Sequence, residues 1–547
     1  MKSADIVLKG NAIFTARCPN LISGGIAIKG NKIVAVGDVG AIDRWIGEET
    51  RVFTYDDKLI MPGFIDAHDH YFMGAISASE HMCTEIAAST SEEECVAIIN
   101  RFAEGHPLEK RILGIGWFPA NWGDAPLPTK RSLDAVISDR PVYLLSADVH
   151  TFWMNSKALD EAGITPEMKP RSGEVGRFDN GELNGLIFEP EAFAPAMAKV
   201  MDLDKEVMKD VHRKFLNHIA ACGVTSISEM SADDYTETTY KNYGVVKEME
   251  EEGELISRIH LYTRLAGYTD FSKAKELEKL YCSEKLRISG VKGFVDGVTS
   301  TFTGYLLEPY SDRPETSGIG APLETKEDME SYIVAANREG LAVRLHCIGD
   351  GAVRMALDMF EASEKENGKH GLKNTIEHIE SIHPDDIPRF AELDVIPSMQ
   401  PYHLTLDCNE KIARIGMERC RWEWPHKTIL ERGGKLAFGT DYPVVDFNPF
   451  PSIYAAVTRC DDNGKPTGIN PEERISLTDA LTAYTAGSAN AYGRLKDLGT
   501  LEEGKLADVI VVDRNLFTIG PLEIKDASVE LTVMDGRIVY KKKVGIR

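Results

Sequence analysis

Eight short apolar segments alternate with helix-type patterns along the chain, and this alternation restricts the fold more than any other feature. Amphipathic stretches near 235–252, 325–339 and 350–366 follow some of these segments. Apolar strands that alternate with helices are typical of a parallel sheet. Eight such units predict an α/β fold, a closed (β/α)₈ TIM-type barrel. The segments are 64–70, 224–230, 258–264, 288–296, 341–347, 374–380, 394–400 and 435–441.

The two ends of the chain carry a different, β-rich pattern. Residues 1–61 and 498–547 hold short runs of alternating polarity separated by turns such as Asp535-Gly536, which predicts hairpins of an antiparallel sheet. We expect both ends to form one small β-sandwich domain, because either end alone is too short to bury a core. Two separate β tails are the alternative. The barrel domain then covers residues 62–497.

The first and second apolar segments are separated by about 150 residues, which is far longer than an ordinary connection. This stretch has strand-type segments of its own at 111–118 and 141–148, followed by a turn-rich region at 173–189. We therefore expect an inserted α/β subdomain over roughly residues 75–200, above the barrel mouth. With 547 residues, the chain is long enough for a barrel of about 250 residues or more and such additions.

The net charge limits the kind of partner that the chain can bind, and the cysteine spacing indicates the state of its thiols. A formal net charge of −24 argues against nucleic acid or an anionic membrane, because both require a basic face. The nine cysteines are dispersed without a C-x-x-C pair, which indicates reduced thiols. No secretory leader and no apolar run of about 18 residues is visible. We expect a cytoplasmic protein that acts on a small molecule.

Histidines and an aspartate stand at the ends of several predicted strands. His68 and His70 end the first segment and share one face, because strand residues i and i+2 point the same way. His346, His378 and Asp441 fall at or near the ends of the fifth, sixth and eighth segments. Any one of these histidines alone would more often be a core residue. Together they converge on the barrel mouth, where imidazole and carboxylate groups suit a divalent ion, zinc first among them.

Lys292 lies in the fourth segment, four residues before Asp296 and on the same face. Burial and nearby cations both disfavour an ammonium group at such a place. One solution is reaction of the neutral amine with carbon dioxide, which yields a carbamate that bridges two metals. Pairing with Asp296 or binding of substrate is the other interpretation, and the residues alone do not decide between them.

Several segments resemble the metal-ligand blocks of the amidohydrolase superfamily: MPGFIDAHDH, VKGFVDG, LHCIGDGAV, EHIE and FGTDYPV. The resemblance runs nearly from end to end. It is closest to amidohydrolase family 3, the N-substituted formamide deformylase-like branch, and GIGWFPANW and QPYHL are among the supporting blocks. A homodimer is an expectation from the habit of that family only.

The resemblance implies roles for individual residues. His68 and His70 would bind one metal, and His346 and His378 a second. Carboxylated Lys292 would bridge the two ions in such a binuclear centre. A site with a single ion is the other arrangement, and the ligands accept Zn, Mn, Fe, Co or Ni.

The expected activity is hydrolysis of a non-peptide carbon–nitrogen bond, of the amide or formamide type, by metal-activated hydroxide. Asp441 would ligate the first metal and act as general base and then general acid. Deamination of a nitrogen heterocycle is an alternative, but it usually needs a Glu after the fifth-strand histidine, and Ile348-Gly349-Asp350 follows His346 here. A catalytically inactive binding or regulatory relative is the third hypothesis.

Five further residues are candidate substrate contacts. His150 ends a strand of the insertion and would donate to substrate, or else pack in the core. Trp117 and Trp122 would form an apolar wall, or else a structural cluster. Asp296 would orient Lys292 or bind substrate. His403 would overhang the site from the seventh loop.

Overall fold

The computed structural model describes residues 3–123, 126–170, 173–318 and 325–543. Residues 1–2 and 544–547 of the expected composite domain therefore lie outside the described residues, as do 124–125 and 171–172 of the expected insertion. The chain divides into two compact units. The first consists of Met1–Tyr71, Leu216–Tyr235 and Lys247–Arg547, and the second of Phe72–Phe215 and Thr236–Val246.

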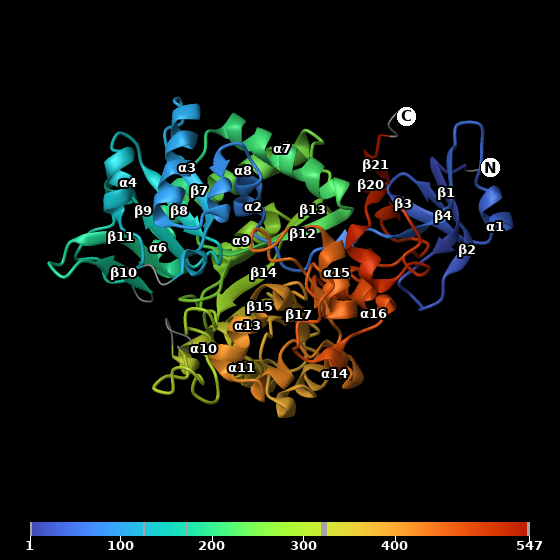
Figure 1. Cartoon of the computed structure of the whole chain (residues 1–547). Helices are drawn as coiled ribbons and strands as arrows, with labels where there is room; N and C mark the ends of the chain where they lie inside the picture. The colour runs from blue at the N-terminus through green and yellow to red at the C-terminus, as the bar shows by residue number, and fades with distance from the viewer. Residues whose placement is uncertain (1–2, 124–125, 171–172, 319–324, 544–547) are drawn as a thin grey trace. The chain divides into compact units, whose positions relative to one another are not determined.

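A parallel sheet of eight strands forms the centre of the first unit (Figure 1). Each strand overlaps one of the eight apolar segments, so the predicted barrel-type fold is confirmed. Backbone hydrogen bonds join the chain beyond the first and last strands, from Ala67 N–H to Phe438 O (3.0 Å) and from Asp441 N–H to His68 O (2.8 Å). In hydrogen-bonded order the strands are β18 (Ala437–Phe438), β17 (Ile396–Met399), β16 (Thr375–His378), β15 (Val343–Cys347), β14 (Leu286–Phe294), β13 (Arg258–Arg264), β12 (Val224–Asp233) and β5 (Phe64–Ile65).

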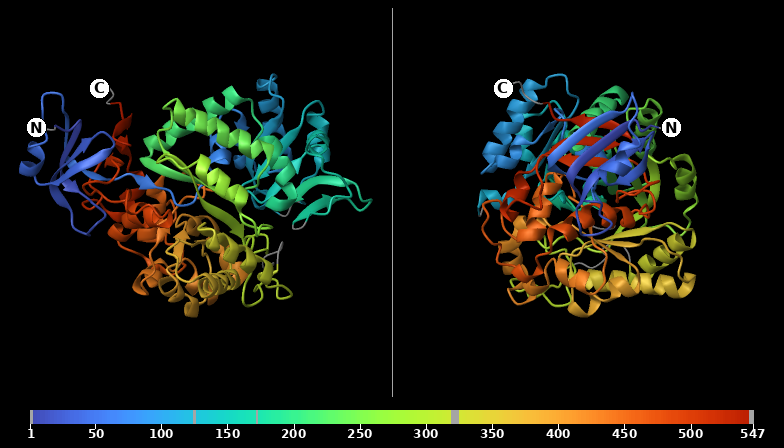
Figure 2. Two further views of the ribbon diagram at one scale, coloured as in Figure 1. Left: turned by 180° about the vertical axis from the view of Figure 1, so that it is seen from behind. Right: turned by 90° about the vertical axis from the view of Figure 1, so that its right-hand side faces the viewer.

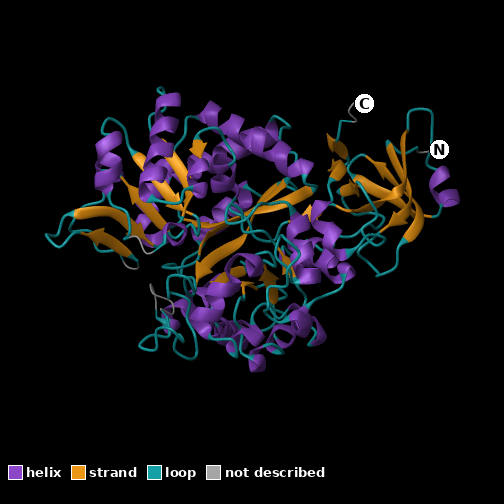
Figure 3. Ribbon diagram, in the orientation of Figure 1, coloured by secondary structure: helices purple, strands orange, loops and turns teal. Residues whose placement is uncertain are grey.

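Helices follow the barrel strands along the chain (Figure 3). In α11 (Asp350–Asn367), the buried Val353, Ala356, Leu357 and Phe360 recur at helical spacing and form one apolar face. The other helices of this region are α9 (Ser272–Leu280), α10 (Lys326–Arg338), α12 (Arg389–Glu392), α13 (His403–Ile415), α14 (His426–Glu431), α15 (Pro449–Thr458), α16 (Leu477–Thr482) and α17 (Ser488–Ala491), and α7 (Lys205–Ala221) and α8 (Glu237–Glu251) each belong partly to both units.

A second sheet of the first unit joins both ends of the chain. It is mixed, with the strand order β21-β20-β19-β4-β1-β2-β3. The predicted sheet from both ends is thus confirmed, although the antiparallel expectation is wrong for β1 and β4, which run parallel. The bounds are β1 (Ile6–Ile13), β2 (Ile22–Lys29), β3 (Lys32–Gly37), β4 (Arg51–Pro62), β19 (Val509–Val512), β20 (Val529–Met534) and β21 (Arg537–Lys541), and the helix α1 (Val39–Asp43) follows β3.

The second unit holds a six-stranded sheet in the order β10-β11-β9-β8-β7-β6, which confirms the inserted sheet (Figure 2). Ser91 begins α3, where its side chain accepts a hydrogen bond from the N–H of Glu94. Among the described residues, no helix is long and apolar enough to cross a membrane. The elements are α2 (Tyr71–Ser77), β6 (Met82–Cys83), α3 (Glu92–Gly105), β7 (Ile112–Trp117), α4 (Lys130–Val136), β8 (Val142–Ser146), β9 (Thr151–Met154), α5 (Ser156–Ala162), β10 (Glu174–Arg177), β11 (Leu183–Phe188) and α6 (Pro190–Val200).

Candidate metal centre

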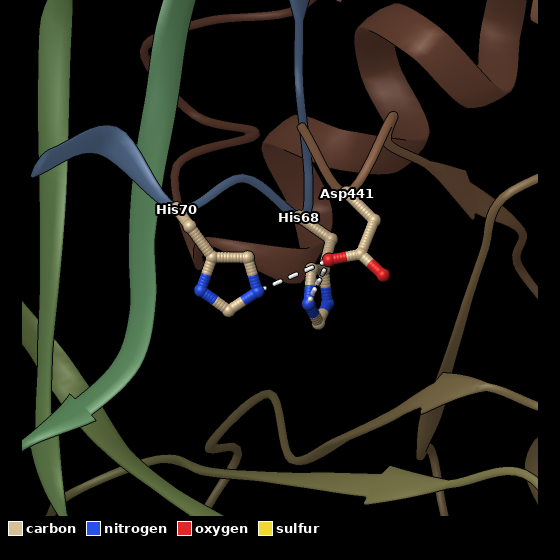
Figure 4. A group of neighbouring side chains, drawn as sticks. All are labelled: His68, His70 and Asp441. Atoms are coloured by element: carbon tan, nitrogen blue, oxygen red, sulfur yellow. Dashed lines mark hydrogen bonds and ion pairs between the residues drawn. The ribbon is translucent and has the colours of Figure 1, made fainter. Parts of the chain in front are cut away.

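Two histidines and an aspartate meet where the first and last barrel strands end (Figure 4). Oδ1 of Asp441 lies 3.3 Å from Nε2 of His68 and 3.1 Å from Nε2 of His70. Neighbouring ligand atoms around a tetrahedral ion with bonds of about 2.0–2.1 Å are roughly 3.3–3.4 Å apart. The three side chains therefore fit one divalent ion.

Asp441 is the electrostatic centre of this group. Burial raises the pKa of its carboxyl group, but the neighbouring imidazoles of His68, His70 and His378 outweigh burial and hold this pKa well below the usual aspartate range. The anion is thus the form that the site stabilises. A carboxylate surrounded by imidazoles is also the donor set that a divalent metal prefers.

The backbone is strained at two of the predicted ligands. His378 has φ of +74° and Asp441 has φ of +63°, in the left-handed region that side chains other than glycine rarely adopt. In a regular strand the consecutive residues Glu377 and His378 would point to opposite faces. The positive φ interrupts this alternation. Strain of this kind persists where the surrounding structure enforces it, as it does at functional sites.

Glu377 orients His68 from inside the barrel. Its Oε2 lies 2.8 Å from Nδ1 of His68, and its Oε1 accepts a hydrogen bond from Arg344 at 3.0 Å. Burial raises the pKa of Glu377, but Arg344 and His68 outweigh it and bring the pKa to about 2. The carboxylate therefore keeps the proton of His68 on Nδ1, and Nε2 is left to face Asp441 and an ion.

His378 and His346 lie next to His68 and each other. The ring centroids are 4.7 Å apart for His68 and His378, and 4.4 Å apart for His346 and His378. Nδ1 of His378 lies 2.9 Å from Oε1 of Gln400, and Nε2 of His346 lies 3.1 Å from the carbonyl oxygen of Gly297. Because these oxygens accept the ring N–H, the proton-free nitrogen is Nε2 in His378 and Nδ1 in His346.

Lys292, on β14, points into the same buried region. Its Nζ has no hydrogen-bond partner among the described residues, and it lies 5.1 Å from the centroid of the Phe294 ring. Burial lowers the pKa of Lys292 to about 8, against the opposing effect of the Glu377 and Asp441 carboxylates. Burial therefore makes the neutral amine, which carbamate formation requires, more accessible than it is at an ordinary exposed lysine.

The structure contradicts a pairing of Lys292 with Asp296. The carboxylate of Asp296 accepts hydrogen bonds from the backbone N–H groups of Tyr305, Ile348 and Gly349 at 2.8–2.9 Å. Burial raises its pKa to about 7 in spite of these bonds. The side chain ties the loops after β14 and β15 together, and its role as a substrate contact stays a prediction.

His403 begins α13, and its Nε2 lies 4.0 Å from Oδ2 of Asp441. This histidine thus belongs to the cluster and not to the rim of the loop. The remaining predicted contacts lie in the second unit. Nδ1 of His150 is 2.7 Å from Oε2 of Glu189. Trp117 and Trp122 stack at 5.9 Å within the core of that unit. Their roles toward substrate stay predictions.

Sequence reasoning missed the residues behind the metal-facing histidines. Glu377 and Glu380 flank His378 in the segment EHIE, and Gln400 precedes His403 in QPYH. Each is buried and lies beside one of the histidines. The available signal was the acidic residue directly before His378, because a buried carboxylate next to a ligand needs a partner.

Comparisons with known proteins agree with this geometry. The model of the amidohydrolase family matches residues 56–540. The protein LONG AFTER FAR-RED 3 of Arabidopsis thaliana is 29% identical over 98% of this chain and 92% of its own. The N-substituted formamide deformylase of Arthrobacter pascens is 23% identical over 98% of each chain. The crystal structure of an uncharacterized metal-dependent hydrolase from Pyrococcus furiosus is 31% identical, with a TM-score of 0.72 over 94% of this chain and 99% of that one.

Proposed function

The chain belongs to the amidohydrolase family and is a metal-dependent hydrolase, and from this premise we propose that it hydrolyses a non-peptide carbon–nitrogen bond of the amide or formamide type. The observation that supports this most directly is that Oδ1 of Asp441 lies within 3.3 Å of Nε2 of both His68 and His70 at the end of the barrel strands. The similarity to a formamide deformylase over 98% of the chain supports the class of bond.

His68, His70 and Asp441 would hold a divalent ion, which we propose to be zinc, and such an ion would lower the pKa of a bound water and polarise a carbonyl group. Asp441 receives the proton of the attacking water and passes it to the leaving nitrogen. Its lowered pKa keeps the carboxylate ionised and ready for the first transfer. Glu377 and Arg344 hold His68 in place during the reaction.

We propose that a second ion binds beside the first, with His346 and His378 among its ligands. The donor nitrogens left on both rings support this, as does the buried, unbonded amine of Lys292 nearby. The neutral amine of Lys292 would attack carbon dioxide, form a nitrogen–carbon bond and release one proton to solvent, which would give an anionic carbamate able to act as a ligand. The two-ion centre and the carbamate are proposals that metal analysis and mass spectrometry test.

The experiment is a panel of N-formyl and N-acyl amines offered to the zinc-loaded protein, with release of formate or carboxylate as the readout. We expect turnover of at least one class, and its loss in Asp441→Asn but not in the exposed control Asp385→Asn. Ammonia released from an aminated heterocycle, with no amide turned over, would replace the proposal with a deaminase. If neither the N-formyl and N-acyl amines nor the aminated heterocycles are turned over, the proposed class of bond is contradicted.

A further inference from the structure

The carboxylate of Asp441 lies between two pairs of histidines. Its Oδ1 faces His68 and His70, as described above. Its Oδ2 lies 3.8 Å from Nδ1 of His378 and 4.0 Å from Nε2 of His403. The rings of His378 and His403 are nearly parallel, with 15° between their planes and 6.4 Å between their centroids. Each oxygen of Asp441 thus has its own pair of imidazoles.

The second group has the dimensions of an ion site. One ligand atom from each of His378, His403 and Asp441 can be chosen so that all lie within 4.8 Å of one another, and all three residues are buried. The separation of 4.0 Å between Nε2 of His403 and Oδ2 of Asp441 exceeds the roughly 3.3–3.4 Å edge of a tetrahedral zinc site. Nδ1 of His378 bonds Gln400, so its separation of 3.8 Å from Asp441 shows that the ring is close and is not itself the edge of an ion site.

His403 has a carboxylate behind it, as His68 does, at a longer distance than the 2.8 Å between His68 and Glu377. Nδ1 of His403 lies 3.6 Å from Oε1 of Glu380, and Oε2 of Glu380 lies 2.5 Å from Nζ of the buried Lys411. The order of groups is cation, carboxylate and imidazole, as in Arg344, Glu377 and His68. Metal-binding histidines almost always have such a carboxylate or carbonyl group at the nitrogen remote from the ion.

The cation behind Glu380 is itself fixed. Lys411 also donates a hydrogen bond to Oγ1 of Thr299 at 2.6 Å and lies 3.6 Å from Oε2 of Glu423. The buried carboxylate of Glu380, fixed by Lys411, therefore stands on the Nδ1 side of His403, while Nε2 of the same ring faces Asp441.

We propose that His403 is a ligand of the second ion, together with His378 and Oδ2 of Asp441. Asp441 would then face one ion with each of its oxygens, whether or not Lys292 carries a carbamate. This inference rests on the metal dependence in the proposed function but not on the bond that is cleaved. All three polar residues of the segment EHIE then act at the metal centre. His378 binds the second ion, Glu377 contacts the imidazole of His68, and Glu380 lies beside the imidazole of His403.

Metal titration of the full-length protein tests the proposal without any substrate. Protein stripped by a chelator is titrated with zinc, and the bound equivalents are counted by mass spectrometry of the metal. We expect two equivalents in the unaltered protein and loss of the second in His403→Ala. The exposed His370→Ala is the matched control and should keep both. The variant Glu380→Gln should bind the second equivalent about 10–100-fold more weakly.

The variant Lys292→Met tests whether binding of the second ion needs a carbamate on Lys292 in addition to His378, His403 and Asp441. Retention of the second ion in Lys292→Met and its loss in His403→Ala support the proposal, and loss in both variants supports His403 as a ligand beside Lys292. Two ions bound with unaltered affinity in His403→Ala, or a single ion in the unaltered protein, would overturn it. Should His403→Ala not fold, anomalous scattering from zinc in crystals of the unaltered protein decides. A zinc–Nε2 distance of about 2.0–2.1 Å at His403 is expected, and a second ion without contact to His403 contradicts the proposal.

The outcome of the hydrolysis assay with N-formyl and N-acyl amines does not depend on the outcome of the metal titration. Binding of two zinc ions, the second through His403, with no amide turned over, would leave the ligand assignment standing and remove the proposed class of bond. Amide turnover by a protein whose second ion does not contact His403 would support the proposed class of bond and remove His403 from the ligand set.

Discussion

Oε2 of Glu377 lies 2.8 Å from Nδ1 of His68, and both side chains are almost completely buried, at 0% and 1% exposure. The contact joins the sixth and first strands of the barrel across its interior. Because Arg344 neutralises the carboxylate from the other side, the pair costs less to bury than a lone charge would. Its effect is to fix which nitrogen of His68 faces Asp441.

Glu377→Gln should weaken binding of the first metal ion about 10–100-fold, because the amide holds the His68 tautomer less firmly than the carboxylate does. Titration of the stripped protein with zinc measures the change. Glu392→Gln, at an exposed position of α12, serves as the control. An unaltered affinity in a folded Glu377→Gln would contradict the role assigned to Glu377.

Asp441→Asn should lower kcat/KM by about 10²–10⁴-fold, because the amide cannot accept the proton of the attacking water. The assay is run at saturating zinc, so that weaker metal binding does not account for the loss. Asp385→Asn, whose side chain is 84% exposed, should behave like the unaltered protein. Full activity of Asp441→Asn would remove Asp441 from the chemistry.

Removal of metal should lower the stability of the barrel. An ion that binds only the folded state at a free concentration of 100 times Kd stabilises it by about 2.7 kcal/mol per site. Thermal unfolding with excess zinc and with excess chelator measures the difference. Equal midpoints under both conditions would mean that the cluster of His68, His70 and Asp441 binds no ion in the folded protein.

Arg258→Met should destabilise the first unit by about 3–5 kcal/mol, because it leaves the buried carboxylate of Asp508 without its cation. Arg258, on β13, donates hydrogen bonds to Asp508 at 2.8 and 2.9 Å and contacts Asp535 at 3.3 Å, so it links the barrel to the sheet formed by both chain ends. Chemical unfolding provides the measurement, with the exposed Arg432→Met as the control.

The ion pair of Arg258 with Asp535 predicts that the stability of the first unit depends on pH. Burial raises the pKa of Asp535, but Arg258 and Lys285 outweigh it, and the pKa lies below its usual value. The stabilisation is therefore complete above the ordinary aspartate pKa of about 4 and is lost as the pH falls through the lowered value. The deficit of Arg258→Met should accordingly be largest near pH 7 and shrink in acid. A deficit that grows in acid would contradict this.

Trp117→Phe should lower the stability of the inserted unit and leave KM unaltered. Trp117 is 1% exposed, and its indole N–H donates a hydrogen bond to the carbonyl oxygen of Leu144 at 3.0 Å. Loss of this bond leaves a buried acceptor unsatisfied, at a cost of about 1–3 kcal/mol. Unfolding and KM are measured in parallel, with Leu108→Ala, at a 95% exposed position, as the control. A raised KM with unaltered stability would make Trp117 a substrate contact.

The positions of the barrel strands, and of the polar side chains at their carboxyl ends, were readable from the sequence. Apolar periodicity marks a strand, and a polar side chain at its carboxyl end must reach the barrel mouth, so His68, His70, His346 and Asp441 were predictable one strand at a time. Each of these inferences uses only neighbouring residues. The parallel pairing of β1 and β4 was not predictable in this way, because hairpin turns indicate only adjacent antiparallel partners.

Contacts across the barrel were decided by the tertiary structure alone. Glu377 meets His68, Glu380 meets His403, and His403 meets Asp441 because closure and register of the sheet bring together residues from different strands and loops. The positive φ of His378 is also imposed from outside the segment EHIE. Local sequence determines the face on which a side chain lies. Which side chain lies opposite depends on the stagger of all eight strands, a property that no single strand contains.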